Sequence, residues 1–152
     1  MVDGKIVTGN AAKLYAAGKG ARVPVVVGAT SSDIGFMQGK SVEELLRRFG
    51  PDAEKARVAY EVHDEEDVRV VVFRMGGDQM MIEPARYVAH VLAERGQPVY
   101  EFRFSYVAES IRGQSGGVTG AMHASDIPFA FDTVAAKYGK DLTEKDSSAA
   151  RQ

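Results

Sequence analysis

The chain has 152 residues, of which 45% are hydrophobic, so it is long enough and apolar enough to form one domain with a core. Its 19 basic and 21 acidic residues give a formal net charge of −2, without the basic excess that attracts nucleic acid or an anionic membrane. It contains no cysteine, which excludes disulfides, thiol catalysis and thiolate metal sites.

A short helix and a buried strand are the first predicted elements. The helix follows Asn10, a typical N-cap residue, and ends before Gly18. The run 23–27 is rich in valine and predicts a buried strand. This strand ends at Gly28, where a loop that contains Asp33 begins.

Two further helices are predicted before residue 62. The capping-box sequence Ser41-Val-Glu-Glu44 begins the first of them, and Gly50-Pro51 ends it and begins the second. The next segment, 67–75, is ambiguous, because valine and phenylalanine favour a strand by residue type while the pattern itself does not distinguish strand from helix.

The clearest helix and strand lie in the second half of the chain. Residues 78–95 form an amphipathic helix, and Pro84 marks its start or a kink. The strand covers residues 98–106, because large aromatic residues alternate there with polar ones. The aromatic positions are Tyr100, Phe102, Phe104 and Tyr106.

The chain reads as one domain, residues 1–139, followed by a polar tail, 140–152, that we expect to be solvated. No apolar run is long enough to span a bilayer, and the N-terminus lacks a signal-peptide pattern. A soluble cytoplasmic protein is therefore the default expectation.

A specific motif surrounds the third histidine. Residues 120–132 read Gly-Ala-Met-His-Ala-Ser-Asp-Ile-Pro-Phe-Ala-Phe-Asp, which resembles the histidine segment of the type-B carboxylesterases, G-A-x-H-A-S-E-I-P-F-V-F-D. The resemblance implies that His123 is a catalytic base. Asp126 matches an acidic family position that supports the histidine region, and as an alternative it caps a short helix beginning at Ile127.

A second segment, 24–33, resembles the strand and loop V-G-x-N-S-D-E of the same family, whose last acid is the triad carboxylate. A gapless alignment from Gly28 places Asp33 at that acid, where the family usually has Glu. Anchoring on Gly35 instead would place Ile34 there, which cannot accept a hydrogen bond from an imidazole. The alternative role for Asp33 is a turn or cap acid. Phe36 matches a position that lines the substrate pocket, although a core Phe is the alternative.

The resemblance extends over most of the chain in family order, through residues 2–7, 22–25, 83–86 and 96–106. It implies an α/β architecture, namely a partial α/β-hydrolase fold that consists of late strands of the sheet with flanking helices, and it favours a helix at 67–75. In that fold the chain order is nucleophile, acid, histidine, and nothing resembling the nucleophile block precedes Asp33. Both candidate residues follow the carboxyl ends of predicted strands, where open α/β sheets place their sites.

Several other motifs are weaker. Gly113-Gln-Ser115-Gly-Gly117 matches the nucleophile-elbow pattern G-x-S-x-G, but it lacks a strand leading in and a helix leading out, so we do not assign Ser115 as the nucleophile. The segment 25–35 lacks two of the glycines of a dinucleotide-binding turn, at Ser32 and Ile34. The acidic run after His63 has no metal-ligand spacing, so we expect no metal and no cofactor.

The resulting functional hypothesis is hydrolysis of a small-molecule carboxylic ester through an acyl-enzyme, with His123 as base and Asp33 as its orienting acid. The alternative is a catalytically silent fragment or an interaction module of the same family. Because the strand at 98–106 would leave apolar faces and edge groups exposed, we also expect self-association or a missing complementary segment.

Overall fold

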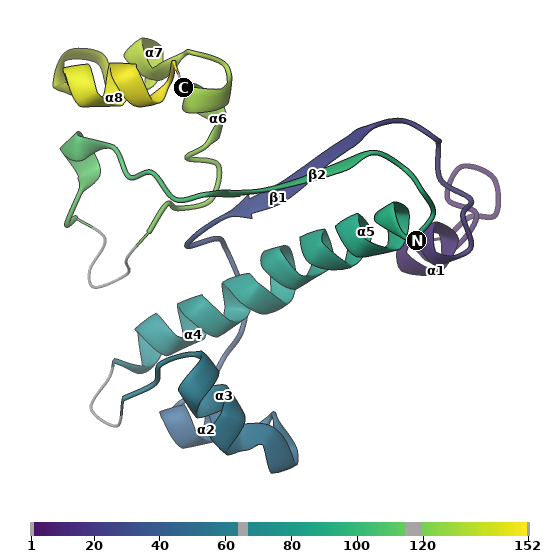
Figure 1. Cartoon of the computed structure of the whole chain (residues 1–152). Helices are drawn as coiled ribbons and strands as arrows, with labels where there is room; N and C mark the ends of the chain where they lie inside the picture. Colours follow the sequence, from purple (N-terminus) through teal and green to yellow (C-terminus); the bar gives the residue numbers. More distant parts are fainter. Residues whose placement is uncertain (1, 64–66, 115–119, 152) are drawn as a thin grey trace.

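A computed structural model describes residues 2–63, 67–114 and 120–151. Its centre is a parallel sheet of two strands, β1 (Val25–Thr30) and β2 (Val99–Phe104), in register from Val25 opposite Val99 to Thr30 opposite Phe104. Helix α5 (Glu83–Ala93) lies along one face of this sheet (Figure 1).

Local chemistry sets the limits of β1. Pro24 has no N–H to donate, so the ladder begins at Val25, whose N–H donates to Pro98 O at 2.9 Å. The strand does not end at Gly28, as the sequence predicted, but continues to Thr30. A Cβ at Gly28 would lie 2.1 Å from Phe102 O, so glycine is what lets β2 approach at this point. The strand predicted at 98–106 is confirmed as β2.

One long helical stretch crosses beneath the sheet (Figure 1). It comprises α4 (Val68–Gly77), a π-helical turn (Asp78–Ile82) and α5. The family resemblance predicted a helix at 67–75, and α4 confirms it, although the β-branched composition favoured a strand. The helix puts Val71 and Met75, four residues apart, on one face, where both are fully buried. Pro84 lacks an N–H and would collide with the carbonyl four residues earlier, and the π turn directly before it accommodates this misfit.

The helices α2 (Val42–Arg47) and α3 (Ala53–Ala59), joined by a 3-10 turn (Gly50–Asp52), pack against α4 through buried residues that include Leu45 and Leu46. The capping box at Ser41 forms only in part. Ser41 Oγ accepts from Glu44 N at 3.2 Å, whereas Glu44 Oε2 accepts from Lys40 N and not from the cap residue itself. The predicted first helix is confirmed as α1 (Ala11–Ala16), which is capped by Asn10 and lies beside α5.

A second helical group contains α6 (Ile127–Ala130), α7 (Val134–Tyr138) and α8 (Glu144–Ala149), with 3-10 turns at Glu109–Ile111 and Gly139–Asp141. It packs on the end of β2 through Phe129. The expectation that residues after 140 are solvated is wrong, because α8 folds onto this group and Asp146 is fully buried.

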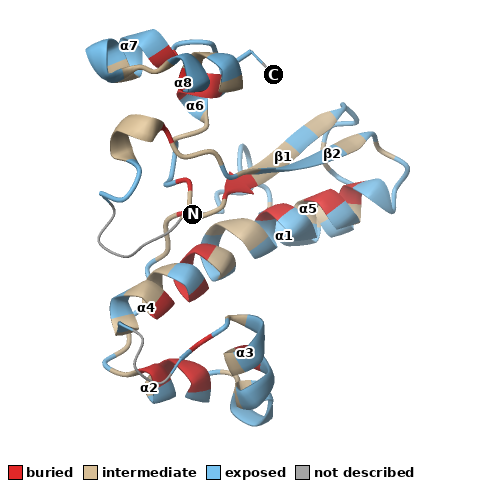
Figure 2. Ribbon diagram, turned by 60° about the vertical axis from the view of Figure 1, so that its left-hand side comes forward, coloured by how far each residue is buried: buried red, intermediate tan, exposed pale blue. Residues whose placement is uncertain are grey.

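The chain exposes much more surface than a compact protein of its mass. Its accessible surface is 10,471 Å², against about 7,500 Å² expected for a compact monomer of 16.4 kDa. Part of the excess comes from the sheet face opposite α5, where Val26, Tyr100 and Phe102 are 70%, 63% and 41% exposed (Figure 2 shows the exposed strands). Among the described residues, no helix is long and apolar enough to cross a membrane.

Candidate active site

Two loops that follow the two strands meet at one end of the sheet. Ser31 N donates to Phe104 O at 2.8 Å, which extends the pairing of β1 with β2 by one residue. Beyond it, Ser32 N donates to Ala121 O and Ala121 N donates to Ser31 Oγ, both at 2.9 Å. These bonds fasten the loop after β1 to the segment that carries His123, although 90 residues separate Asp33 from His123 in the chain.

Asp33 lies in the first of these loops and is almost completely enclosed. Its side chain is 4% exposed. Its Oδ2 accepts from Thr30 N at 3.0 Å, and its Oδ1 accepts from Ile34 N at 2.8 Å. Burial raises the pKa of Asp33, but the hydrogen bonds from Thr30, Ile34 and the His123 ring outweigh burial, so its pKa lies below the ordinary value. The carboxyl group is therefore ionised at neutral pH.

His123 binds this carboxylate through one ring nitrogen. Its Nδ1 lies 2.6 Å from Asp33 Oδ1, while the ring is 52% exposed. An ionised carboxylate can only accept a hydrogen bond, so Nδ1 carries the proton and Nε2 of the neutral ring is left as a proton acceptor. The predicted hydrogen bond between the two residues, at the same end of one sheet, is confirmed.

Glycines let the surrounding backbones approach closely. A Cβ at Gly77, the last residue of α4, would lie 2.5 Å from Asp33 O, and one at Gly35 would lie 1.9 Å from the carbonyl carbon of Gly76. Gly120 has φ +114°, and a Cβ there would lie 2.7 Å from Ser31 Oγ. The sequence patterns place Gly120 in the histidine motif but do not mark Gly35, Gly76 or Gly77 as parts of the site. The Gly76-Gly77 pair inside an apolar helical run is the signal that could have revealed the contact.

Comparison with known proteins assigns the chain to a family. The carboxylesterase family model matches residues 1–152. The chain belongs to the carboxylesterase family. No curated protein matches it. Membership supports ester hydrolysis at the level of the family and implies an α/β-hydrolase fold, of which the parallel β1–β2 pair with its helices is a part.

The other residues that the sequence predicts for this site have mixed outcomes. Phe36 is 73% exposed, so the alternative of a core Phe is wrong, and its contact with substrate stays a prediction. Asp126 occupies the cap position of α6, but its side chain makes no cap hydrogen bond. Ile34, which the alternative alignment placed at the acid position, donates its backbone N–H to Asp33 Oδ1. Ser115 lies outside the described residues.

A hollow of about 490 Å³ lies beside the loop that contains Asp33 (the acid loop), between this loop and the long helical stretch. Its lining includes Ser31, Asp33, Tyr60, Asp78 and Arg103. Tyr60 OH donates to Asp78 Oδ2 at 2.5 Å, and burial together with this carboxylate raises the Tyr60 pKa above its usual range. Tyr60 therefore stays protonated and links α3 to the π turn below the acid loop.

Within the described ranges, no group of three or more His, Asp or Glu residues could hold a metal ion.

Proposed function

We propose that this chain contributes the base and the acid of a serine-type hydrolase of carboxylic esters, with His123 as the base and Asp33 as its orienting acid. The observation that carries the proposal is the 2.6 Å contact between His123 Nδ1 and Asp33 Oδ1, which leaves His123 Nε2 as a proton acceptor on an exposed ring. Membership in the carboxylesterase family supports the same chemistry.

The proposed reaction follows from this tautomer. His123 Nε2 removes the proton of a nucleophilic hydroxyl as its oxygen bonds to the ester carbonyl carbon, and then gives that proton to the alkoxide that leaves. Water, deprotonated by the same nitrogen, then bonds to the acyl carbon. The bond from this carbon to the nucleophile's oxygen breaks, and His123 Nε2 returns the proton to that oxygen, which releases the acid. Asp33 stays ionised throughout, because its lowered pKa favours the carboxylate that stabilises the imidazolium.

The hydroxyl nucleophile and the substrate contacts are the remaining parts of the proposal. We do not assign the nucleophile to Ser115, because the sequence around it lacks the strand and helix of an elbow. Phe36 lies three residues after Asp33 and presents its ring to solvent, which suits contact with an apolar part of the ester.

The test is hydrolysis of p-nitrophenyl acetate. We expect His123→Ala to lower the rate by on the order of 10²–10⁴-fold with an unchanged far-UV spectrum and only a small fall in melting temperature, because this histidine acts in the transition state and Asp33 keeps its two backbone donors. The matched control is His90→Ala, since His90 is a solvent-exposed histidine on α5 whose Nε2 lies 3.2 Å from Glu94 Oε1.

Three outcomes would contradict parts of the proposal. Equal loss in His90→Ala and His123→Ala would show that the assay does not report this site. Loss in Ser115→Ala equal to that in His123→Ala would identify the loop serine as the nucleophile. Hydrolysis by the wild-type chain no faster than in buffer would favour the alternative, a catalytically silent chain or an interaction module.

A further inference from the structure

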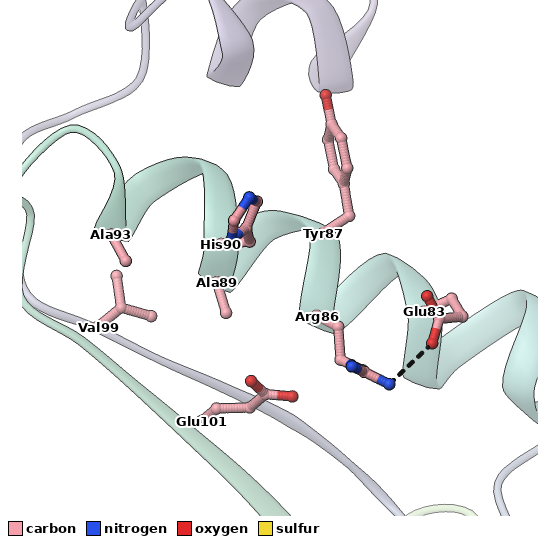
Figure 3. A pocket seen from close by; sticks show the side chains of 8 residues that line it. All are labelled: Glu83, Arg86, Tyr87, Ala89, His90, Ala93, Val99 and Glu101. Atoms are coloured by element: carbon pink, nitrogen blue, oxygen red, sulfur yellow. Dashed lines mark hydrogen bonds and ion pairs between the residues drawn. The ribbon is translucent and has the colours of Figure 1, made fainter.

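β2 has an outer edge, which faces away from β1. Among the described residues β2 pairs with β1 alone, so its other edge has no strand partner. A groove of about 500 Å³ runs between this edge and α5, with a lining drawn from α5 together with Val99 and Glu101 (Figure 3). Figure 3 shows Glu101 projecting from β2 toward α5 beside this groove.

The hydrogen bonds of β1 determine which backbone groups of β2 point outward. Val25 N donates to Pro98 O at 2.9 Å and Ser31 N donates to Phe104 O at 2.8 Å. Because residues of a parallel strand alternate in the side to which they bond, the even-numbered residues of β2 face β1. The N–H and C=O groups of Val99, Glu101 and Arg103 therefore point to the free edge.

The charges on this edge are self-complementary. Glu101 and Arg103 are exposed, lie on the same face of β2, and make no ion pair with any described residue. If two copies of β2 pair antiparallel about a two-fold axis at Phe102, Glu101 of one copy lies opposite Arg103 of the other, twice. The backbone N–H and C=O groups of residues 101 and 103 also point to the free edge. Each Glu101–Arg103 pair would therefore be a hydrogen-bonded pair of the antiparallel ladder.

The charges also select this register. An axis at Glu101 would place two glutamates opposite each other, and an axis at Arg103 would place two arginines opposite each other. The axis at Phe102 avoids both repulsions. On the far face of the sheet it brings Tyr100 of one copy opposite Phe104 of the other and places the two Phe102 rings together, which covers aromatic surface that a single copy exposes.

We propose that the outer edge of β2 binds a second copy of this chain, antiparallel and centred on Phe102, to form a four-stranded sheet in the order β1, β2, β2, β1. The proposal is independent of ester hydrolysis. It rests on the open edge, the self-complementary charges, and the exposed aromatic surface of Tyr100 and Phe102 on β2.

The first test is sedimentation velocity of charge-reversed variants over a range of concentrations. We expect the wild-type chain to form a dimer as concentration rises, and E101R and R103E each to remain monomeric over that range. The double variant E101R/R103E should dimerise again, because the charged pairs are re-formed with reversed sign. An equimolar mixture of E101R and R103E should form a heterodimer, since every cross-strand pair is then attractive.

The control is E54R, a charge reversal on the exposed surface of α3, which should dimerise like the wild type. A chain that stays monomeric at every concentration would overturn the proposal and would favour coverage of this edge by another protein segment. A dimer that survives E101R or R103E, or one that the double variant fails to restore, would also overturn it.

A second test does not depend on charge. The chain contains no cysteine, so single replacements are unambiguous. F102C should form a disulfide-linked dimer under mild oxidation, because directly opposite side chains have Cβ atoms about 4.5–5.5 Å apart at the narrow pairs of an antiparallel sheet. V26C, a more exposed position on the same face but on β1, should remain a monomer. Equal crosslinking of the two variants would contradict the proposed axis.

Discussion

Asp33 is buried, charged and supplied with three hydrogen-bond donors, the N–H groups of Thr30 and Ile34 and the His123 ring. A buried carboxylate is stable only when such donors replace water. Two of the three are backbone N–H groups within three residues of Asp33, so the local backbone holds this carboxylate independently of His123. This explains how an exposed histidine can keep one tautomer, because its partner is fixed by the backbone.

We expect Asp33→Asn to reduce ester hydrolysis by on the order of 10³-fold or more, because an amide can donate to Nδ1 and so favour the wrong tautomer. We also expect the short hydrogen bond to give a strongly deshielded Nδ1 proton in the wild type and expect this NMR signal to be absent in Asp33→Asn. Asp132→Asn is the control, since this exposed residue has φ +50°, which Asn adopts readily. Retention of both activity and the deshielded proton in Asp33→Asn would contradict the assigned role.

Asp146, which lies outside the candidate site, is a second buried carboxylate that hydrogen-bond donors stabilise. It accepts hydrogen bonds from Tyr106 OH at 2.8 Å, from Glu109 N at 3.1 Å and from both donors of Thr143. Burial raises its pKa, but these donors outweigh burial and lower the value to about 2. Asp146 therefore ties α8 to the segment that follows β2, through Tyr106 and Glu109.

Asp146→Asn should lower the free energy of unfolding at pH 7 by about 2 kcal/mol. The folded-state pKa is depressed, so this contribution is present above the ordinary pKa of 3.8 and is lost as pH falls toward about 2. The gap between variant and wild type should therefore shrink over that interval in denaturant titrations. Asp141→Asn, at an exposed residue of the neighbouring 3-10 turn, should show no such gap.

At the scale of elements, α4 does more than cover a core. Its last residue, Gly77, touches the backbone of Asp33, so the end of this helix supports the acid loop from below. The π turn that follows keeps the helical stretch continuous through Pro84, and α5 then reaches the sheet. The position of the acid loop therefore depends on where α4 ends.

Gly77→Ala should lower ester hydrolysis and weaken the Asp33–His123 contact. Alanine favours a helix by about 1 kcal/mol over glycine, but its Cβ would lie 2.5 Å from Asp33 O, and backbone overlap of this kind costs about 1–3 kcal/mol. Activity and the NMR signal of Nδ1 report the displacement. Gly9→Ala, where the new Cβ meets only the flexible side chain of Leu14 at 3.3 Å, should leave both unchanged.

At the scale of the whole molecule, the chain consists of helical groups on opposite sides of a small open sheet (Figure 1). The α2–α4 group and the α6–α8 group have separate buried clusters. The sheet between them has one face on α5 and the other in solvent. The large accessible surface follows from this arrangement, and so does the unpaired edge of β2.

Amide exchange should report this edge directly. In dilute samples the amides of Glu101 and Arg103 should exchange rapidly, since they point away from β1, while the amide of Phe102 should be protected by its ladder bond. At high concentration all of these amides should be protected if the second copy pairs as proposed. Rapid exchange of Glu101 and Arg103 at every concentration would contradict that pairing.

Short-range sequence signals predict several elements of this fold. The caps at Asn10 and Ser41, the alternating aromatics of β2 and the motif around His123 each specify a local structure, because a neighbour within a few residues supplies the contact that matters. Where the contact is distant, sequence patterns failed: composition favoured a strand at α4, and polarity favoured a solvated tail at α8. Only the tertiary structure decided that Val71 and Met75 face a core and that Asp146 replaces water with distant donors. The same holds for the site, because the family motif named Asp33 and His123, but only folding across 90 residues brings them to 2.6 Å.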